Sequence, residues 1–288
     1  MNLFSQSIVS GLMTGSVYAL MAIGLVVVYR TSRVLNLAHG ESFAVGGIAA
    51  AMAAQAGLPL WVTAIVAVSS GALLSIATYQ FVLRSRTQLP LSSLVLITLA
   101  VAFLLRGVMY AAVGPDAVSF PALVTGPPLR VAGGIVPLQG LLLLVLGIAA
   151  STLLAAILHM TFLGKQLLAT AENPSATQLL GVNVERARLL SFGMSGGLAG
   201  LSALLLIPLI SVDYQAGLAM TMRGFIAAAI AGMSPMLSIF SGLVLGLFEA
   251  LIGSYVGTLF QDPIVFGVLI MIALWQSRNI RFGGMKRA

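Results

Sequence analysis

Long apolar runs separated by short polar stretches occupy most of the chain. A helix needs about 20 mostly apolar residues to cross the hydrocarbon core of a membrane, which is roughly 30 Å thick. Because backbone polar groups in lipid must be satisfied within the segment, each run of this length predicts a transmembrane helix. Six runs qualify, at residues 8–29, 60–83, 91–113, 138–163, 189–210 and 236–257.

Two further apolar stretches, residues 42–56 and 224–233, are too short to span a membrane alone. We expect them to be incomplete crossings or segments that enter aqueous or protein-lined space. A last run at 263–276 completes the set. The pattern predicts an all-α polytopic membrane protein with about eight to nine membrane segments, two of them short or re-entrant, in a single domain over residues 1–288.

Composition supports the membrane assignment and narrows the chemistry. Apolar residues make up 59% of the chain and charged residues only 7%, whereas a soluble domain carries about a quarter charged residues. This excludes a water-soluble globule and a disordered chain. The chain has no cysteine, which excludes thiol catalysis, disulfides and cysteine-based metal clusters.

The basic residues predict the orientation, because short cytoplasmic loops carry an excess of Lys and Arg. With the N-terminus outside and nine crossings, Arg106, Arg130 and Arg223 fall on the outer side and eleven basic residues fall on the inner side. Counting only one short segment as re-entrant would invert every later segment, so 42–56 and 224–233 either both cross or both re-enter. The eleven inner residues are Arg30, Arg33, Arg84, Arg86, Lys165, Arg186, Arg188, Arg278, Arg281, Lys286 and Arg287. Since these charges lie at the ends of apolar runs, the net charge of +7 does not indicate nucleic-acid binding.

The longest inner loop, residues 164–188, has the pattern helix, break, helix. Asn173 followed by Pro174 is typical of an N-cap and a first helical position. Leu179 and Leu180 give the second helix an apolar face before Gly181 ends it. Such a helix either docks in a partner's groove or lies on lipid headgroups, and the residues alone leave both interpretations open.

Four polar residues at membrane depth are candidates for a pathway lining or a gate. Asn36, His39 and Glu41 follow the first span, and Glu249 lies within a Gly-rich apolar run. Groups of this kind usually face protein or a water-filled cavity, and burying an acid at a helix centre costs about 2.5–3.5 kcal/mol. The first three are equally suited to satisfying a broken helix, and Glu249 requires a partner, for which Arg106 and Arg223 are candidates.

The residues of the inner loop carry a resemblance to a known family. Gly164, Leu167, Ala169, Ala171, Ala176 and the run Leu180-Gly181-Val182 resemble the corresponding loop of branched-chain amino-acid ABC transporter permeases of the LivH/LivM type, and of urea and short-amide importers. Residues 11–25 and Leu35-Asn36-Leu37-Ala38-His39-Gly40-Glu41 resemble the N-terminal signature of that family. The stretches 223–225, 231–235 and 246–249 resemble its C-terminal block, although Met233-Ser234-Pro235 replaces a glycine-rich turn.

The resemblance, closer to LivH than to LivM, implies a permease subunit of an ATP-driven importer in a bacterial inner membrane. It implies a LivM-like second permease subunit, two ATP-binding subunits and a periplasmic solute-binding protein as partners. ATP and Mg would be bound by the ATPases, and this chain would hold no cofactor or metal. The N-terminus is expected outside and the C-terminus in the cytoplasm.

Two groups of residues receive roles from the resemblance. The loop 164–188 would be the coupling segment that docks on the ATPase, and Asp213, Tyr214 and Arg223 would lie in an outer loop that meets the binding protein. The solute remains open among branched-chain and other amino acids, urea and amides. The expected ATPase contacts are Leu167, Ala171, Glu172, Asn173, Pro174, Ala176, Leu179, Leu180 and Gly181.

Two other function classes remain in view. An ion-coupled secondary transporter would use acidic residues and broken helices at the membrane midplane, which suits the two short segments but leaves the inner loop without a purpose. An intramembrane enzyme using His39 and Glu41 lacks both a metal-binding His-Glu-x-x-His pattern and a nucleophile elbow. No phosphate-binding loop occurs in the chain, so ATP hydrolysis would belong to other subunits.

Overall fold

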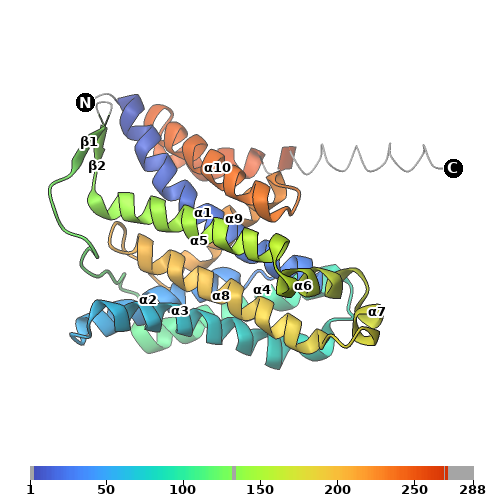
Figure 1. Cartoon of the computed structure of the whole chain (residues 1–288). Helices are drawn as coiled ribbons and strands as arrows, with labels where there is room; N and C mark the ends of the chain where they lie inside the picture. The colour runs from blue at the N-terminus through green and yellow to red at the C-terminus, as the bar shows by residue number, and fades with distance from the viewer. Residues whose placement is uncertain (1–2, 132–133, 269, 272–288) are drawn as a thin grey trace, which may run out of the picture.

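A computed structural model describes residues 3–131, 134–268 and 270–271 as a bundle of helices with one small hairpin (Figure 1). Among the described residues, six helices are long and apolar enough to cross a membrane. The central one, α1, is buried along most of its length, whereas α3 and α4 expose most of theirs. The six are α1 (Leu3–Ser32), α3 (Leu60–Ala77) with its extension to Arg86, α4 (Leu91–Val113), α5 (Leu138–Met160), α8 (Val184–Leu206) and α10 (Pro235–Tyr255).

The two ends of the bundle differ in structure and in charge. The antiparallel strands β1 (Leu129–Val131) and β2 (Gly134–Val136) lie beside the start of α1, and we call this the hairpin end. The helices α6 (Phe162–Glu172) and α7 (Pro174–Leu179) lie at the opposite end, the α7 end (Figure 1). Basic residues gather at the α7 end, where the Arg33 side chain donates to the α6 backbone and Arg84 pairs with Glu185 at the start of α8.

Two shorter helices start inside the bundle and run in opposite directions. After α1 ends at the α7 end, the non-helical residues 33–38 lead back into the bundle, and α2 (His39–Gln55) starts at the depth of Gly24, against which His39 packs. After α8 ends at the hairpin end, residues 207–215 return, and α9 (Ala216–Ile230) starts beside Gly40 and runs to the α7 end. Each of these irregular stretches and the short helix after it together take the chain between the two ends of the bundle.

The helices α1 and α10 pack backbone against backbone. A methyl group added at Gly11 would lie 2.8 Å from the Leu247 Cα atom, and one added at Gly15 would lie 2.8 Å from the Leu243 Cα atom. Gly242 and Gly246 of α10 meet the α1 backbone in the same way. Small residues therefore allow the close approach by which helices associate through dispersion contacts in a membrane.

Most predicted segments correspond to helices, and their boundaries differ for local reasons. The helix α8 begins at Val184 rather than 189 because the Asn183 side chain caps it, accepting from the Arg186 N–H. The predicted run 138–163 ends earlier, at Met160, because Thr161 caps α6. Of the predicted run 263–276, residues 263–268 are helical, whereas 269 and 272–276 lie outside the described residues, as do Arg278, Arg281, Lys286 and Arg287.

Candidate functional site

The loop expected to dock on an ATPase forms two short helices with a sharp break. Asn173 ends α6 and caps α7, and its Oδ1 atom accepts from the Ala176 N–H at 3.0 Å. Gly181 ends the segment in the left-handed region, with φ of +81° and open space around it. Both features follow from the Asn-Pro pair and the glycine, as the sequence predicts.

The apolar side chains of α7 and its C-cap project away from the bundle. Leu179 is 90% exposed and Leu180 is 83% exposed. Leu167 differs from the expectation: its side chain is 1% exposed and packs beneath α6 against Leu158 and Ile23 of the bundle, so it cannot contact a partner. The remaining expected contacts are accessible: Glu172, Asn173, Ala176 and Gly181 are exposed, and Ala171 and Pro174 are half-buried.

The non-helical stretch 33–38 is held inside the bundle by two threonines from neighbouring helices. The Thr98 hydroxyl of α4 accepts from the Leu37 N–H at 3.1 Å and lies 3.3 Å from the Leu35 carbonyl. The Thr221 hydroxyl of α9 accepts from the Gly40 N–H at 2.8 Å. Asn36 contributes locally, since its Oδ1 atom accepts from the Ala38 N–H. Backbone groups freed by the break are thereby satisfied away from water, as membrane burial requires.

His39 and Glu41 point to different neighbours, so they do not form one acid–base unit. The His39 Nδ1 atom lies 3.0 Å from the Ser195 hydroxyl of α8. Glu41 is fully buried, and its Oε1 atom accepts from the Arg106 Nε and Nη2 atoms at 3.0 and 2.8 Å. Arg106 of α4 therefore pairs with Glu41 and not with Glu249, for which it was one of two candidate partners.

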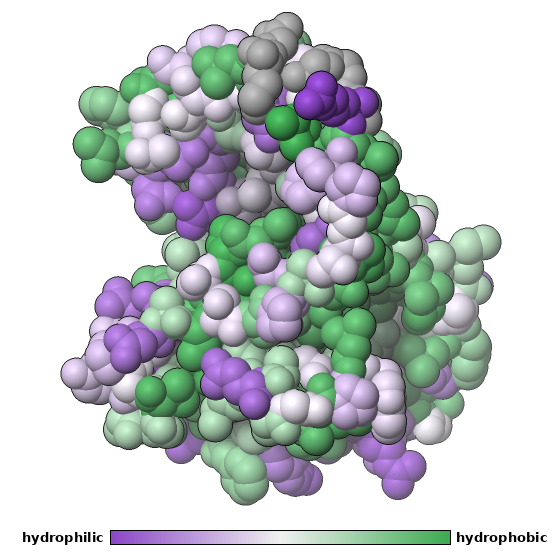
Figure 2. All heavy atoms as spheres, turned by 90° about the vertical axis from the view of Figure 1, so that its left-hand side faces the viewer, coloured by the Kyte–Doolittle hydropathy of each residue, from purple (hydrophilic) through white to green (hydrophobic). Residues whose placement is uncertain are grey.

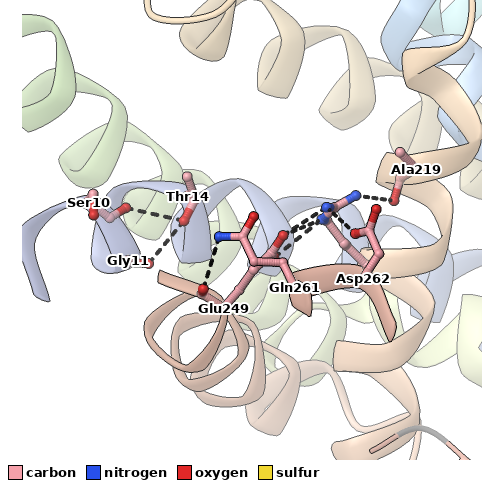
Figure 3. Close-up of polar contacts among 8 residues, drawn as sticks. Ser10, Gly11, Thr14, Ala219, Glu249, Gln261 and Asp262 are labelled. Carbon is pink, nitrogen blue, oxygen red and sulfur yellow. Dashed lines mark hydrogen bonds and ion pairs between the residues drawn. The ribbon is translucent and has the colours of Figure 1, made fainter. Parts of the chain in front are cut away.

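Glu249 has the partner that its burial requires. Its carboxylate accepts from the Arg223 Nη2 atom at 2.8 Å and from Nε at 3.0 Å (Figure 3). The same Nη2 atom also donates to Asp262 at 2.8 Å. The expected loop position of Arg223 is wrong: the residue lies in α9, 17% exposed, because two carboxylates from later in the chain neutralise it.

A polar pocket of about 380 Å³ lies beside this ion-pair cluster, between α1 and α10, and we call it the α1–α10 pocket. Figure 3 draws four of the lining residues, Ser10, Thr14, Glu249 and Gln261, and the Gln261 amide donates to the Glu249 carbonyl at 3.1 Å. Figure 2, which looks onto the hairpin end, shows the molecule hollowed on one side with hydrophilic atoms above the hollow. The pocket is lined by Ser10, Thr14, Tyr18, Glu249, Ala250, Gly253, Ser254, Thr258 and Gln261.

Asp213 and Tyr214 lie in the returning stretch 207–215, half-buried. Asp213 accepts from the Gln215 N–H at 2.9 Å, and the Tyr214 ring meets the Tyr110 ring of α4 edge-on at 5.2 Å. Val212 of the same stretch pairs with Val118 of the loop after α4. These contacts hold the stretch against the rest of the hairpin end, and Arg223 is not part of this group.

Sequence reasoning missed Thr98, Thr221, Gln261 and Asp262. The two threonines sit in apolar helices, where a hydroxyl usually bonds to its own helix, so nothing in the pattern marks them. Asp262 carries a usable signal, because an acid beside a predicted span can neutralise a basic residue elsewhere in the membrane. Across the described residues, no three His, Asp or Glu side chains come together as metal ligands would.

Comparison with known proteins gives a consistent result over nearly the whole chain. A family described as "Branched-chain amino acid transport system / permease component" matches residues 7–274. The permease protein LivH of the high-affinity branched-chain amino acid transport system of Escherichia coli (strain K12) is 28% identical over 291 residues, covering 94% of this chain and 93% of LivH. BraD of Pseudomonas aeruginosa is 28% identical, covering 96% of this chain and 95% of BraD. These matches confirm the resemblance seen in the sequence.

A solved structure supports the fold. It is described as a metal-chelate type ABC transporter in an inward-facing conformation, and it aligns with a TM-score of 0.50 over 93% of this chain and 85% of its own. At 16% sequence identity, the likeness concerns the fold alone.

Proposed function

The chain belongs to the family of branched-chain amino acid transport permease components, and we propose that it is the LivH-like membrane subunit of an ATP-driven importer. The solute is a branched-chain amino acid, as the names of the LivH and BraD relatives state for their systems, or a related small polar solute such as urea or an amide. The observation that carries the proposal is the pair of exposed leucines on a rigidly capped helix, Leu179 and Leu180.

The α7 helix is the docking surface for an ATPase subunit in this proposal. An exposed apolar pair at a polar, basic end of a bundle favours a protein groove, since an amphipathic helix lays its apolar face in such grooves. Two ATP-binding subunits would bind ATP and Mg, and this chain would supply none of the nucleotide chemistry. Closure of the ATPases on ATP would move α6 and α7, and the bundle would alternate access.

The remaining partners are assigned according to which end of the bundle faces the cytoplasm and which faces outside. The basic residues at the α7 end support a cytoplasmic position for that end, with the N-terminus outside. The stretch with Asp213 and Tyr214 at the hairpin end would then face the solute-binding protein. A second, LivM-like permease subunit would complete the pathway, to which the buried polar residues Asn36, His39, Glu41 and Glu249 contribute.

The docking surface is tested by the double substitution Leu179→Asp, Leu180→Asp in the assembled importer. We expect solute-dependent ATP hydrolysis to fall to the level without solute, because two charges cannot enter an apolar groove unpaired. Membrane insertion should be unchanged, since both side chains project away from the bundle. Measurements are ATP turnover in proteoliposomes and co-purification with the ATPases.

The matched control is Leu129→Asp, at a half-exposed leucine of the hairpin end. It introduces the same kind of charge on the opposite side of the bundle and should leave ATPase binding intact. Retained coupling in the Leu179, Leu180 variant would contradict the proposed docking surface. Solute transport by the chain in the absence of any ATPase would instead support the secondary-transporter interpretation, which the two broken helices also suit.

A further inference from the structure

The α1–α10 pocket has a lining that does not suit contact with lipid. Hydroxyl groups of Ser10 and Thr14 come from the first half of α1, and that of Ser254 comes from the last turn of α10. Both helices are long and apolar enough to cross a membrane. The Ser10 and Thr14 hydroxyls donate to carbonyls of their own helix, and the Ser254 hydroxyl accepts from Ser7. The costly group in the lining is therefore the Glu249 carboxylate, because an ionisable group at membrane depth faces protein or a water-filled cavity.

The opposite side of α10 is apolar and provides the contrast. Phe240 is 67% exposed and Val244 is 59% exposed, at the i, i+4 spacing that puts them on one helix face. Lipid can cover that face without cost. The pocket side of the same helix carries Glu249 and Gly253 instead, so α10 separates an apolar surface from a polar one.

The charge beside the pocket is unbalanced. Arg223 donates to both Glu249 and Asp262, so one positive charge lies between two negative charges and the cluster carries a net charge of −1. The Arg223 Nη1 atom contacts the Ala219 carbonyl at 3.5 Å. Asp262 is 63% exposed, so one carboxylate of the cluster faces outward (Figure 3).

The rim of the pocket depends on a glycine. A methyl group added at Gly253 would overlap the amide of Gln261. Its absence lets the Gln261 side chain lie across α10 and donate to the Glu249 carbonyl. The position of the Gln261 side chain at the pocket rim therefore depends on the absence of a side chain at position 253.

We infer that the α1–α10 pocket is a water-filled section of the solute pathway that accepts a cationic group, of the kind an amino acid presents as its ammonium. The inference rests on the proposed function, in which this chain and a second permease subunit together line a pathway. It adds where on this chain the solute passes and which charge the pathway favours. The net negative cluster attracts the ammonium, and the hydroxyl groups of Ser10, Thr14 and Ser254 replace water around the solute.

The absence of cysteine from the chain makes a direct test possible, because a single introduced cysteine is unique. Thr14→Cys and, on the other wall, Ser254→Cys are each placed in the assembled importer in proteoliposomes. Each is treated with a cationic and an anionic methanethiosulfonate reagent, and the two rates are divided by those of a small thiol in water. We expect the normalised cationic rate to exceed the anionic rate by about tenfold, as one unit charge at close range produces.

Two control variants test whether labelling depends on the pocket and on its charge, and a third measurement tests whether the solute enters it. Ser69→Cys lies on an exposed face of the apolar helix α3 and should react with neither charged reagent, since it faces lipid. Asp262→Asn in the Thr14→Cys background removes the net charge and should abolish most of the preference. Turnover with leucine as the probe solute, its binding protein and ATP should slow cationic labelling of Thr14→Cys.

Each contrary result overturns the inference. Labelling of both pocket cysteines no faster than at Ser69→Cys would mean that the pocket is closed to water. Equal normalised rates for the two reagents would remove the charge preference, and labelling unaffected by turnover would remove the pocket from the pathway. If the pocket fails while the Leu179, Leu180 variant still loses coupling, the proposed permease function stands without this site.

Discussion

Buried charged side chains in this bundle need a partner of opposite charge, and this need fixes the positions of single residues. The Glu41 carboxylate is fully buried and packs against Gly217, where an added methyl group would lie 2.6 Å from its Oε2 atom. Its position in the first turn of α2 is favourable, because the helix N-terminus carries a partial positive charge. Arg106 supplies the countercharge and thereby fixes α4 to α2.

Replacing one residue of the Arg106–Glu41 pair should destabilise the protein more than replacing both. We expect Arg106→Gln to destabilise the protein by about 3–5 kcal/mol, because Glu41 would remain buried without a countercharge. Adding Glu41→Gln should recover part of the loss, since a neutral amide needs no ion partner. Thermal unfolding of the purified complex in detergent measures both, and equal stability of single and double variants would contradict the argument.

Elements that break inside the membrane depend on hydroxyl groups of other elements, which accept from the freed backbone N–H groups. The start of α2 is positioned by Thr221 of α9, whose hydroxyl accepts from the Gly40 N–H and lies 3.0 Å from the Gly217 carbonyl of its own helix. Thr98 of α4 does the same for the preceding stretch. Side chains of α4 and α9 therefore hold the interrupted backbone at the start of α2.

Thr221→Val should cost about 1–3 kcal/mol, because the buried Gly40 N–H loses its acceptor. Thr221→Ser keeps the hydroxyl and should recover most of this loss. The matched control is Thr78→Val, since the Thr78 hydroxyl donates only within its own chain segment, to the Leu74 carbonyl. The test is the change in unfolding temperature, and a similar loss for Thr78→Val would show that any buried threonine matters equally.

At the scale of the whole molecule, α1 and α10, the first and last of the six long helices described, pack against each other. Because α1 and α10 meet backbone to backbone at glycines, the α1–α10 pocket and the α1 core depend on the same spacing. A wider spacing would shift α10 relative to α9 and would pull Glu249 away from Arg223.

Gly246→Ala should therefore destabilise the bundle by about 1–3 kcal/mol, because its methyl group would overlap Gly11 and Gly15. Gly107→Ala is the control, at a helical glycine of α4 with no atom within 4 Å of the added methyl group. There, alanine should stabilise by up to about 1 kcal/mol through helix propensity. The measurement is the unfolding temperature of each variant. If both temperatures change in the same direction, close packing is not the cause.

Sequence periodicity predicted the segments that face lipid on one side, because their apolar runs are uninterrupted. The predicted run 91–113 coincides with α4, and 236–257 differs from α10 by one or two residues at each end. The start of α9 was missed by eight residues, since Arg223 interrupts the apolar run and its neutralising partners are distant in the chain.

The candidate site was predictable only where local chemistry determines it. The cap at Asn173 and the stop at Gly181 follow from adjacent residues, and the structure has both. The burial of Leu167 was not predictable, because an amphipathic helix does not reveal which of its leucines contacts the bundle. The α1–α10 pocket combines α1, α10 and the residues after α10, and no local pattern joins segments so distant in sequence.

The segment that connects α1 to α2 is in contact with α6, and this contact has a mechanical consequence. The Thr170 hydroxyl of α6 contacts the Thr31 carbonyl near the end of α1, and Arg33 donates to the Ala171 carbonyl. Residues 33–38 then lead directly to His39 and Glu41. A displacement of α6 would therefore reach the buried carboxylate through six residues of non-helical backbone, so that no long helix has to bend for one end of the protein to influence its interior.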